Sequence, residues 1–178
     1  MEKYHDVEWG VPLFDDKKIF EFLVLDGFQA GLSWKIILDR RDFFRDSFYG
    51  FDPFIVANLS KSYIDELLIN PKIIRNRQKI NATIENAKAF IKVINEFGSF
   101  SNFIWGFVDG KPIHNQWNHW DEIPSSTPIS MKVSKELISR KFQFVGPVIC
   151  YAFLQSIGII NDHTLNCFRY SEIINLQK

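Results

Sequence analysis

The hydrophobic and polar positions of this chain follow a helical pattern over most of its length. Between Asn76 and Phe97, apolar residues recur at helical spacing and form one stripe: Ile80, Ile84, Ala87, Ile91 and Ile94. A helix with one such stripe buries that face against other elements. The pattern therefore predicts a long core helix over residues 76–97.

Capping residues and shorter apolar runs predict further helices. Residues 109–128 contain turn formers without a helical period and predict a long loop, and no alternation persists long enough to predict a strand. We expect an all-α fold in one helical domain over residues 1–178, because about 100 to 200 residues usually share one core. The predicted helices cover residues 15–26, 33–44, 53–58, 60–68, 100–107 and 130–140, with another from just after Gly146 to about Ser156.

Composition narrows the function without naming it. Hydrophobic residues make up 46% and charged residues 24%, which excludes disordered and low-complexity proteins. The 21 Lys and Arg balance 21 Asp and Glu, so any nucleic-acid affinity must come from charge gathered on one face. No apolar run approaches the roughly 20 residues of a membrane helix, and two cysteines are too few for a disulfide scaffold. We expect a cytoplasmic protein without membrane association.

One carboxylate occupies a position meant for burial. Asp26 follows Ile19, Phe22 and Leu23 on the apolar face of its predicted helix. A buried carboxylate must be paired, hydrogen-bonded or facing a cavity. Two alternatives remain open: Asp26 turns outward at the helix end, or it lines a pocket in which Trp34 provides a flat wall. An aromatic ring beside a carboxylate suits a planar or cationic ligand.

A short hairpin, residues 142–146, joins two predicted helices. A turn ending in Gly146 would leave backbone N–H groups pointing at a phosphate, whereas the alternative is an ordinary helix-to-helix turn closed by a glycine. Short charge runs are usually solvated helix faces, but two basic stretches accompanying the hairpin favour a nucleic-acid backbone. They are Lys132, Lys135, Arg140 and Lys141, and Lys72, Arg75, Arg77 and Lys79.

A third constellation could bind a metal. His163 and Cys167 are spaced to share one face of a helical turn, and His5 is the candidate to join them from the other end of the chain. Structural zinc normally takes four ligands, so a hydrogen-bonded histidine beside a free thiol is the alternative. The other thiol, Cys150, lies in an apolar run and is expected in the core.

The chain contains six segments in this order: YHDVEWGVP (4–12, with Val7 between the matching parts), QAGLSW (29–34), IIRNR (73–77), STP (126–128), FVG (144–146) and NDH (161–163). Together these segments resemble the 3-methyladenine DNA glycosylase I family. The resemblance covers nearly the whole chain, and it implies a helix-hairpin-helix fold of the base-excision type. It also implies a zinc-binding element, formed by residues 1–10 and 160–170, that ties the chain ends together.

The resemblance implies a role for each candidate residue. In the pocket, Tyr4 and Trp34 would stack on a base flipped out of the duplex, with Trp9 close by, and Asp26 would be the catalytic carboxylate. Gly31 and Leu32 would enter the gap left in the duplex, and the hairpin residues Phe144, Val145 and Gly146 would contact the DNA backbone. The zinc ligands would be His5, His163 and Cys167.

Two features depart from the family pattern. The family typically has Glu where this chain has Asp26, and the missing methylene draws the carboxylate back from the base. The family also has an initial segment with an aromatic residue and a fourth zinc ligand, a Cys, which would lie upstream of Met1. Three alternatives stay open: a true start further upstream, zinc held by three residues plus water or another group, or no zinc.

The function that the resemblance implies is hydrolytic removal of 3-methyladenine from alkylated double-stranded DNA during base-excision repair. The enzyme would be a monofunctional glycosylase and is expected to be a monomer. The alternative is a non-catalytic helical protein that binds damaged DNA, in which the shorter Asp26 has abolished turnover. Asp162 resembles the aspartate of other helix-hairpin-helix glycosylases, but its offset from Gly146 is short and it is assigned no role.

Overall fold

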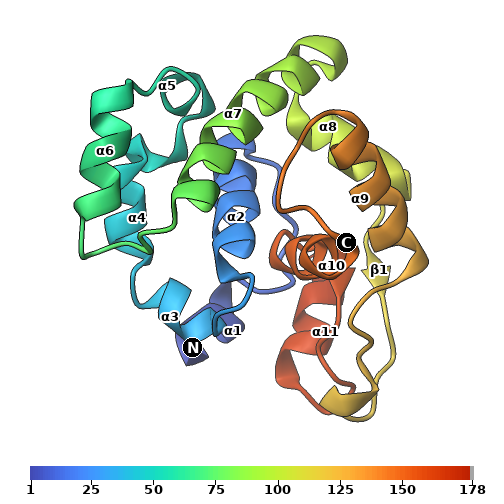
Figure 1. Cartoon of the computed structure of the whole chain (residues 1–178). Helices are drawn as coiled ribbons and strands as arrows, with labels where there is room; N and C mark the ends of the chain where they lie inside the picture. The colour runs from blue at the N-terminus through green and yellow to red at the C-terminus, as the bar shows by residue number, and fades with distance from the viewer. Residues whose placement is uncertain (177–178) are drawn as a thin grey trace.

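Helix α2 (Asp16–Gln29) runs through the middle of the computed structural model, which describes residues 1–176. Every residue from Ile19 to Phe28 is buried, and other helices lie on both sides of α2 (Figure 1). The expected single apolar face was therefore too narrow a description. The helix also continues past Asp26 to Gln29, which excludes the alternative that Asp26 turns outward at a helix end.

The remaining helices fall on two sides of α2 (Figure 1). On one side lie α4 (Arg41–Ser47), α5 (Pro53–Val56) and α6 (Lys61–Ile69), with α7 (Arg77–Phe97) crossing beside α2, and on the other lie α8 (Phe100–Trp105), α9 (Pro128–Ser139), α10 (Pro147–Ser156) and α11 (Phe168–Asn175). Helices α1 (Glu2–Val7) and α3 (Trp34–Leu38) lie together at one end of the molecule. Short 3-10 turns are η1 (Tyr49–Phe51), η2 (Gly106–Val108) and η3 (Trp120–Glu122).

The helical prediction is confirmed, with differences at particular places. The sequence offered Asp15 or Asp16, Ser33 or Gly31, and Ser60 as helix caps, and the structure has Asp15, Ser33 and Ser60 as the N-caps. The helix expected over residues 33–44 is two helices, because the chain bends at Asp39 and Arg40 before α4. Helix α9 begins at Pro128 rather than at residue 130, since proline suits the first turn of a helix.

Two short helices and two short strands were not predicted. Helices α1 and α11 are stabilised by packing of the chain ends rather than by a long apolar period. In the expected loop, β1 (Ile113–His114) pairs in parallel with β2 (Ile160–Asn161), which holds the loop against the end of the chain. Two-residue strands are too short to leave an alternating pattern in the sequence.

The two ends of the chain are joined through their backbones. The N–H of Gly10 donates to Gln155 O (3.1 Å), and the N–H of Leu13 donates to Ile157 O (3.0 Å). Gly158 makes this approach possible, because a Cβ built there would lie 2.2 Å from the Val11 carbonyl carbon. Its φ of +71° also favours glycine. Among the helices of residues 1–176, none has both the length and the apolar character that a membrane crossing requires.

Replacing Gly158 with Ala is expected to lower the free energy of unfolding by roughly 3 kcal/mol, because the methyl group meets the backbone of Val11 and the backbone is strained. Urea unfolding measures this loss. Gly110→Ala is the matched control, since Gly110 has a φ of +72° but no atom within 4 Å of the added Cβ. Equal losses in the two variants would show that the close approach to Val11 contributes nothing.

Candidate functional site

A cavity of about 340 Å³ lies where α1, the end of α2, the start of α3 and the end of α10 meet. This volume suits a small ligand. The cavity brings together the four predicted pocket residues Tyr4, Trp9, Asp26 and Trp34, and its wall is completed by Met1, His5, Gln29, Ala152, Gln155 and Ser156.

Sequence reasoning missed the contribution of α10 to this wall. Ala152 and Ser156 lie four residues apart and therefore share one face of the helix. A small polar residue on that face, at the end of an otherwise apolar run, was the signal that could have identified Ser156.

Asp26 is the most unusual group in the cavity. Its residue is only 2% exposed, and its Oδ2 atom is buried without a hydrogen-bond partner among residues 1–176. Burial raises the pKa of the Asp26 carboxyl well above its usual range, and a hydrogen bond with Ser156 only partly opposes this. The environment of Asp26 therefore favours the neutral carboxyl.

The Tyr4 hydroxyl extends this polar arrangement. It donates to Ser156 Oγ at 3.1 Å, which leaves the proton of Ser156 free to point at Asp26. Burial and then the nearby Asp26 raise the pKa of Tyr4, so the phenol remains a donor. The side chains Tyr4, Ser156 and Asp26 thus form one hydrogen-bonded series along the cavity wall.

Two aromatic rings frame the cavity beside this series. The rings of Tyr4 and Trp34 meet edge to face, with centroids 5.4 Å apart and planes inclined at 60°. The Trp34 indole N–H is buried and has no hydrogen-bond partner in the described part of the chain. The cavity lining therefore combines aromatic rings with two residues, Asp26 and Trp34, that each carry a buried unpaired polar atom.

The segment between α2 and α3 is a tight turn. Leu32 N–H donates to Gln29 O (2.7 Å), and the Gln29 side-chain amide donates to Leu32 O (2.9 Å). Ala30 has φ −48° and ψ 114°, and Gly31 has φ +79°, as a type II turn requires. Gly31 is exposed and Leu32 half-buried, so the turn formed by residues 29–32 lies at the rim of the cavity. We call residues 29–32 the wedge turn.

The predicted hairpin connects α9 with α10. Lys141, at φ +73°, ends α9 in a Schellman motif, with Phe142 N–H donating to Leu137 O and Lys141 N–H to Ile138 O. The glycine expected to close this turn, Gly146, is instead the N-cap of α10.

This hairpin presents backbone rather than large side chains. Val145 is buried, so a DNA contact at that position would have to use its backbone, while Phe144 is half-buried. Gly146 supplies no side-chain cap to α10. The N–H groups at the start of α10 are therefore placed to receive an anion such as a phosphate.

Several residues of the two basic stretches are already engaged within the protein. Arg140 pairs with Glu96 and Glu136, and Arg77 lies 3.6 Å from Asp65. Lys79 is buried. The positive charge available to a ligand at these stretches is therefore smaller than the sequence suggested.

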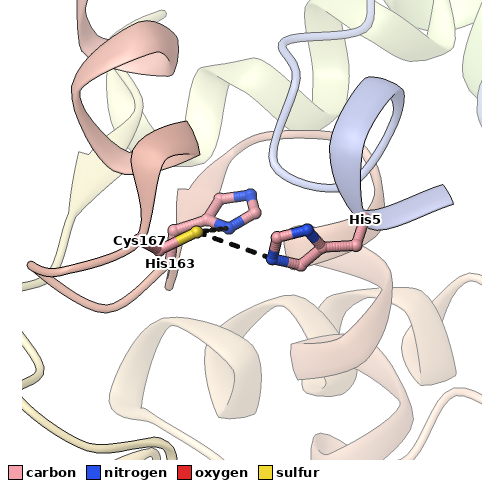
Figure 2. Close-up of side chains that lie close together, drawn as sticks. All are labelled: His5, His163 and Cys167. Atoms are coloured by element: carbon pink, nitrogen blue, oxygen red, sulfur yellow. Dashed lines mark hydrogen bonds between the residues drawn. The ribbon is translucent and has the colours of Figure 1, made fainter. Parts of the chain in front are cut away.

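The three predicted metal ligands converge (Figure 2). Cys167 Sγ lies 3.6 Å from His5 Nε2 and 3.5 Å from His163 Nδ1, and the three ligand atoms lie within 4.8 Å of one another. Tetrahedral zinc with its usual bond lengths would separate sulfur and nitrogen ligands by about 3.6 Å. These distances therefore fit a zinc ion.

The other nitrogen of each imidazole is held by an acceptor. His5 Nδ1 lies 2.8 Å from the Asp6 carboxylate, and His163 Nε2 lies 3.1 Å from Trp9 O. Such bonds direct the lone pair of the opposite nitrogen toward the metal position. Burial lowers the pKa of His163 to about 4, which keeps that ring neutral and able to coordinate. Within residues 1–176 the group contains three ligands.

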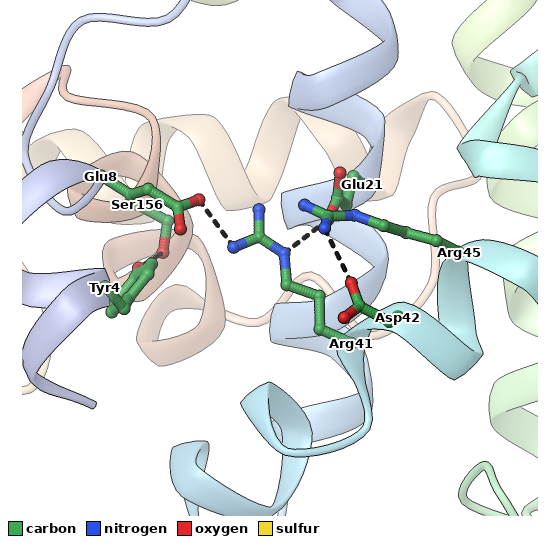
Figure 3. Close-up of polar contacts among 7 residues, drawn as sticks. All are labelled: Tyr4, Glu8, Glu21, Arg41, Asp42, Arg45 and Ser156. Carbon is green, nitrogen blue, oxygen red and sulfur yellow. Dashed lines mark hydrogen bonds and ion pairs between the residues drawn. The ribbon is translucent and has the colours of Figure 1, made fainter.

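Behind the cavity lies a network of charged side chains (Figure 3). Arg41 donates to Glu8 (2.6 Å) and to Glu21 (2.5 Å), and Arg45 donates to Glu21 (2.9 Å). The network joins α1, α2 and α4 and lines a second cavity of about 420 Å³, which shares Ser156 with the first. It therefore fixes the helices that carry the pocket.

Asp162, which received no role from the sequence, is buried and fully bonded. Its carboxylate accepts hydrogen bonds from Asn115, Trp117, Tyr151 and Gln155. These bonds hold the loop that precedes α9, so the role of Asp162 is structural.

Two curated relatives are similar to this chain over most of its length. A DNA-3-methyladenine glycosylase of Haemophilus influenzae is 43% identical over 164 residues, which cover 92% of this chain and 89% of that protein. DNA-3-methyladenine glycosylase 1 of Escherichia coli strain K12 is 44% identical over 167 residues, which cover 94% and 89% of the two chains.

Solved structures agree with these relatives. The structure of Staphylococcus aureus 3-methyladenine DNA glycosylase I, described as the basis of its 3-methyladenine recognition, matches with a TM-score of 0.91 and 36% identity. The match covers 94% of this chain and 89% of that one. The family model described as methyladenine glycosylase matches residues 1–170. The predicted family and all-α fold are confirmed, and the chain belongs to the methyladenine glycosylase family.

Proposed function

We propose that this protein is a DNA glycosylase that hydrolytically removes 3-methyladenine from alkylated double-stranded DNA in base-excision repair. The observation that carries the proposal is the unpaired, buried Asp26 oxygen in the same small cavity as the rings of Tyr4 and Trp34. The named activities of the Haemophilus influenzae and Escherichia coli relatives support it.

The first step is extrusion of the damaged nucleotide, since a base inside the duplex cannot reach the cavity. Extrusion costs a few kcal/mol of stacking and pairing. Leu32, the last residue of the wedge turn, fills the gap left in the duplex. The hairpin backbone at Phe144 to Gly146 receives the phosphate groups, so the duplex is held while the base turns out.

Selectivity follows from the charge of the damaged base. Methylation at N3 makes adenine cationic within the nucleoside, and a cation gains roughly 0.5 to 2 kcal/mol from the face of Trp34. It also lowers the pKa of Asp26 by favouring the ionised carboxylate. Neutral adenine gains little from either group, so it does not recover the cost of extrusion.

Bond cleavage requires less of the protein than removal of an undamaged base, because alkylation has already weakened the glycosidic bond. The bond electrons leave with the base, positive charge develops on the sugar, and water adds to the sugar carbon and releases a proton. Asp26 and the DNA phosphates stabilise that charge. Asp162 takes no part, because its carboxylate is occupied by four internal hydrogen bonds.

A non-catalytic binder of damaged DNA is the alternative, and the named activities of the relatives do not favour it. It would bind alkylated duplex in a salt-sensitive manner without releasing base. The protein is also predicted to be a monomer and to lie in the cytoplasm. The predicted location agrees with genomic DNA as the proposed substrate.

Zinc is proposed as a structural cofactor held by His5, His163 and Cys167. The sulfur-to-nitrogen distances and the fixed orientation of both imidazoles support it. The ion would fasten α1, which carries Tyr4, to the segment before α11. The fourth position would be taken by water or another group.

The activity itself is tested with duplex DNA that contains 3-methyladenine, by chromatography of the free base. The protein is expected to release the base faster than spontaneous loss, and Trp34→Ala to reduce release about 10- to 100-fold, because aromatic stacking on a base contributes about 1 to 3 kcal/mol. Trp120→Ala, at an 80% exposed indole, is the control and should retain activity. Absence of released base with the native protein would refute the proposed function.

Asp26→Asn keeps the size of the side chain and removes its charge. We expect single-turnover excision to fall about 100-fold or more, because a charge stabiliser in a water-poor site has been lost. Asp26→Glu, which supplies the family's usual length, should preserve or raise the rate. A loss in the Glu variant would show that the pocket geometry has been misinterpreted.

The same Asn variant has an expected effect on stability. Because burial raises the folded-state pKa of Asp26, its contribution to stability is largest below the unfolded pKa of about 4 and is lost as pH rises toward the folded value. The free energy of unfolding of Asp26→Asn should therefore increase relative to the native protein between pH 5 and pH 8. A constant difference across this range would contradict the burial argument.

Purified protein is expected to contain about one zinc per chain by elemental analysis. Cys167→Ala should lose the metal and lower the melting temperature, and a chelator should destabilise the native protein in the same way. Cys150→Ala is the control, because Cys150 lies in the core within α10. Full zinc content in Cys167→Ala would exclude the proposed site.

A further inference from the structure

Lys79 is a buried lysine whose ammonium is directed at backbone carbonyls. The residue is 8% exposed, and its Nζ donates to Phe28 O at 2.8 Å and to Ala30 O at 2.6 Å. Phe28 belongs to the last turn of α2, and Ala30 is the first central residue of the wedge turn. Carbonyls at the end of a helix lack intrahelical donors and carry partial negative charge, so a cation suits them.

No carboxylate accounts for this burial. In the described part of the chain, Lys79 forms no ion pair with Asp or Glu, and lysine is rarely buried without a charged partner. Burial lowers the pKa of Lys79, which is a cost to the folded protein. The bonds to the two carbonyls are therefore the specific gain from placing a lysine here.

The same helix also holds the hairpin. Asn86 lies seven residues after Lys79, two helical turns along the same face of α7. Its amide donates to Gln143 O (3.0 Å), and its side-chain oxygen accepts from Gln143 N–H (2.7 Å). The Lys79 ammonium itself lies 6.0 Å from the centre of the Phe144 ring. Helix α7 thus fixes the wedge turn and the hairpin relative to each other.

We propose that Lys79 is a positioning residue for base extrusion, which holds the wedge turn at the distance from the hairpin that lets Leu32 enter the duplex. The inference rests on the proposed function. Lys79 is absent from the lining of the cavity that holds Asp26, so we expect it not to touch a base bound there. Its loss should impair opening of the duplex and leave the cavity intact.

A comparison of two substrates separates this role from a general structural one. One substrate places 3-methyladenine in a fully paired duplex, and the other places it in a single-nucleotide bulge, where little pairing opposes extrusion. Lys79→Met keeps the length of the side chain and removes the ammonium. Lys88→Met is the matched control, because Lys88 is a solvent-exposed lysine of the same helix and pairs only with Glu85 within residues 1–176.

Lys79→Met is expected to excise the paired base about 10- to 100-fold more slowly than the native protein, as displacement of a positioned group by about 1 Å can cause. On the bulged substrate its rate should remain within about threefold of the native rate, because little pairing has to be broken to extrude the base. Its affinity for free 3-methyladenine, measured by calorimetry, should be unchanged. Lys88→Met should match the native protein on both substrates.

Equal losses on paired and bulged DNA, weaker binding of the free base, or unchanged excision of the paired base would each overturn the inference. If Lys79→Met does not fold, as judged by thermal unfolding, Lys79→Gln takes its place, because its amide keeps N–H donors without the charge. The same ratio of excision rates on paired and bulged DNA then decides the inference. A native protein inactive on both substrates would instead refute the proposed function, so the two failures are distinguishable.

Discussion

The site depends on one constraint, a carboxyl group placed in an interior that cannot solvate its charge. Asp26 sits in the middle helix with one oxygen unpaired and a raised pKa, and the fold tolerates it because Ser156 and Tyr4 provide a single line of hydrogen bonds. A cationic ligand would stabilise the ionised Asp26 carboxylate, whereas a neutral ligand would leave its charge unfavourable in the interior. The burial of Asp26 therefore contributes directly to the proposed discrimination between cationic and neutral bases, beside the contribution of Trp34.

Much of the fold was predictable because local signals agree with the tertiary structure. The stripe that begins at Ile80, and the caps at Asp15 and Ser60, all lie where the structure has them. Contacts between residues that lie far apart in the sequence could not be predicted. Ser156 completes the pocket only because α10 packs beside α2, and Lys79 appeared as a surface cation although it is buried against backbone.

The candidate site was predictable to a similar degree. Asp26 and Trp34 were predicted because they lie close together in the sequence. The spacing of His163 and Cys167 predicted a metal site with His5, and the resemblance added Tyr4 and Trp9 to the pocket. Local pattern could not reveal that Val145 is buried or that α9 ends with a left-handed Lys141. Both depend on how the hairpin packs, and a lysine in that conformation leaves no sequence signature as a glycine does.

The hydrogen bond between Tyr4 and Ser156 spans 152 positions of the chain. Contacts between such distant residues form late, because the closure entropy of a long loop must be met first. During synthesis, α1 leaves the ribosome long before α10 does. A nascent chain therefore has the first half of the pocket but cannot enclose a purine, and discrimination between damaged and normal bases arises only when both ends of the polypeptide have come together.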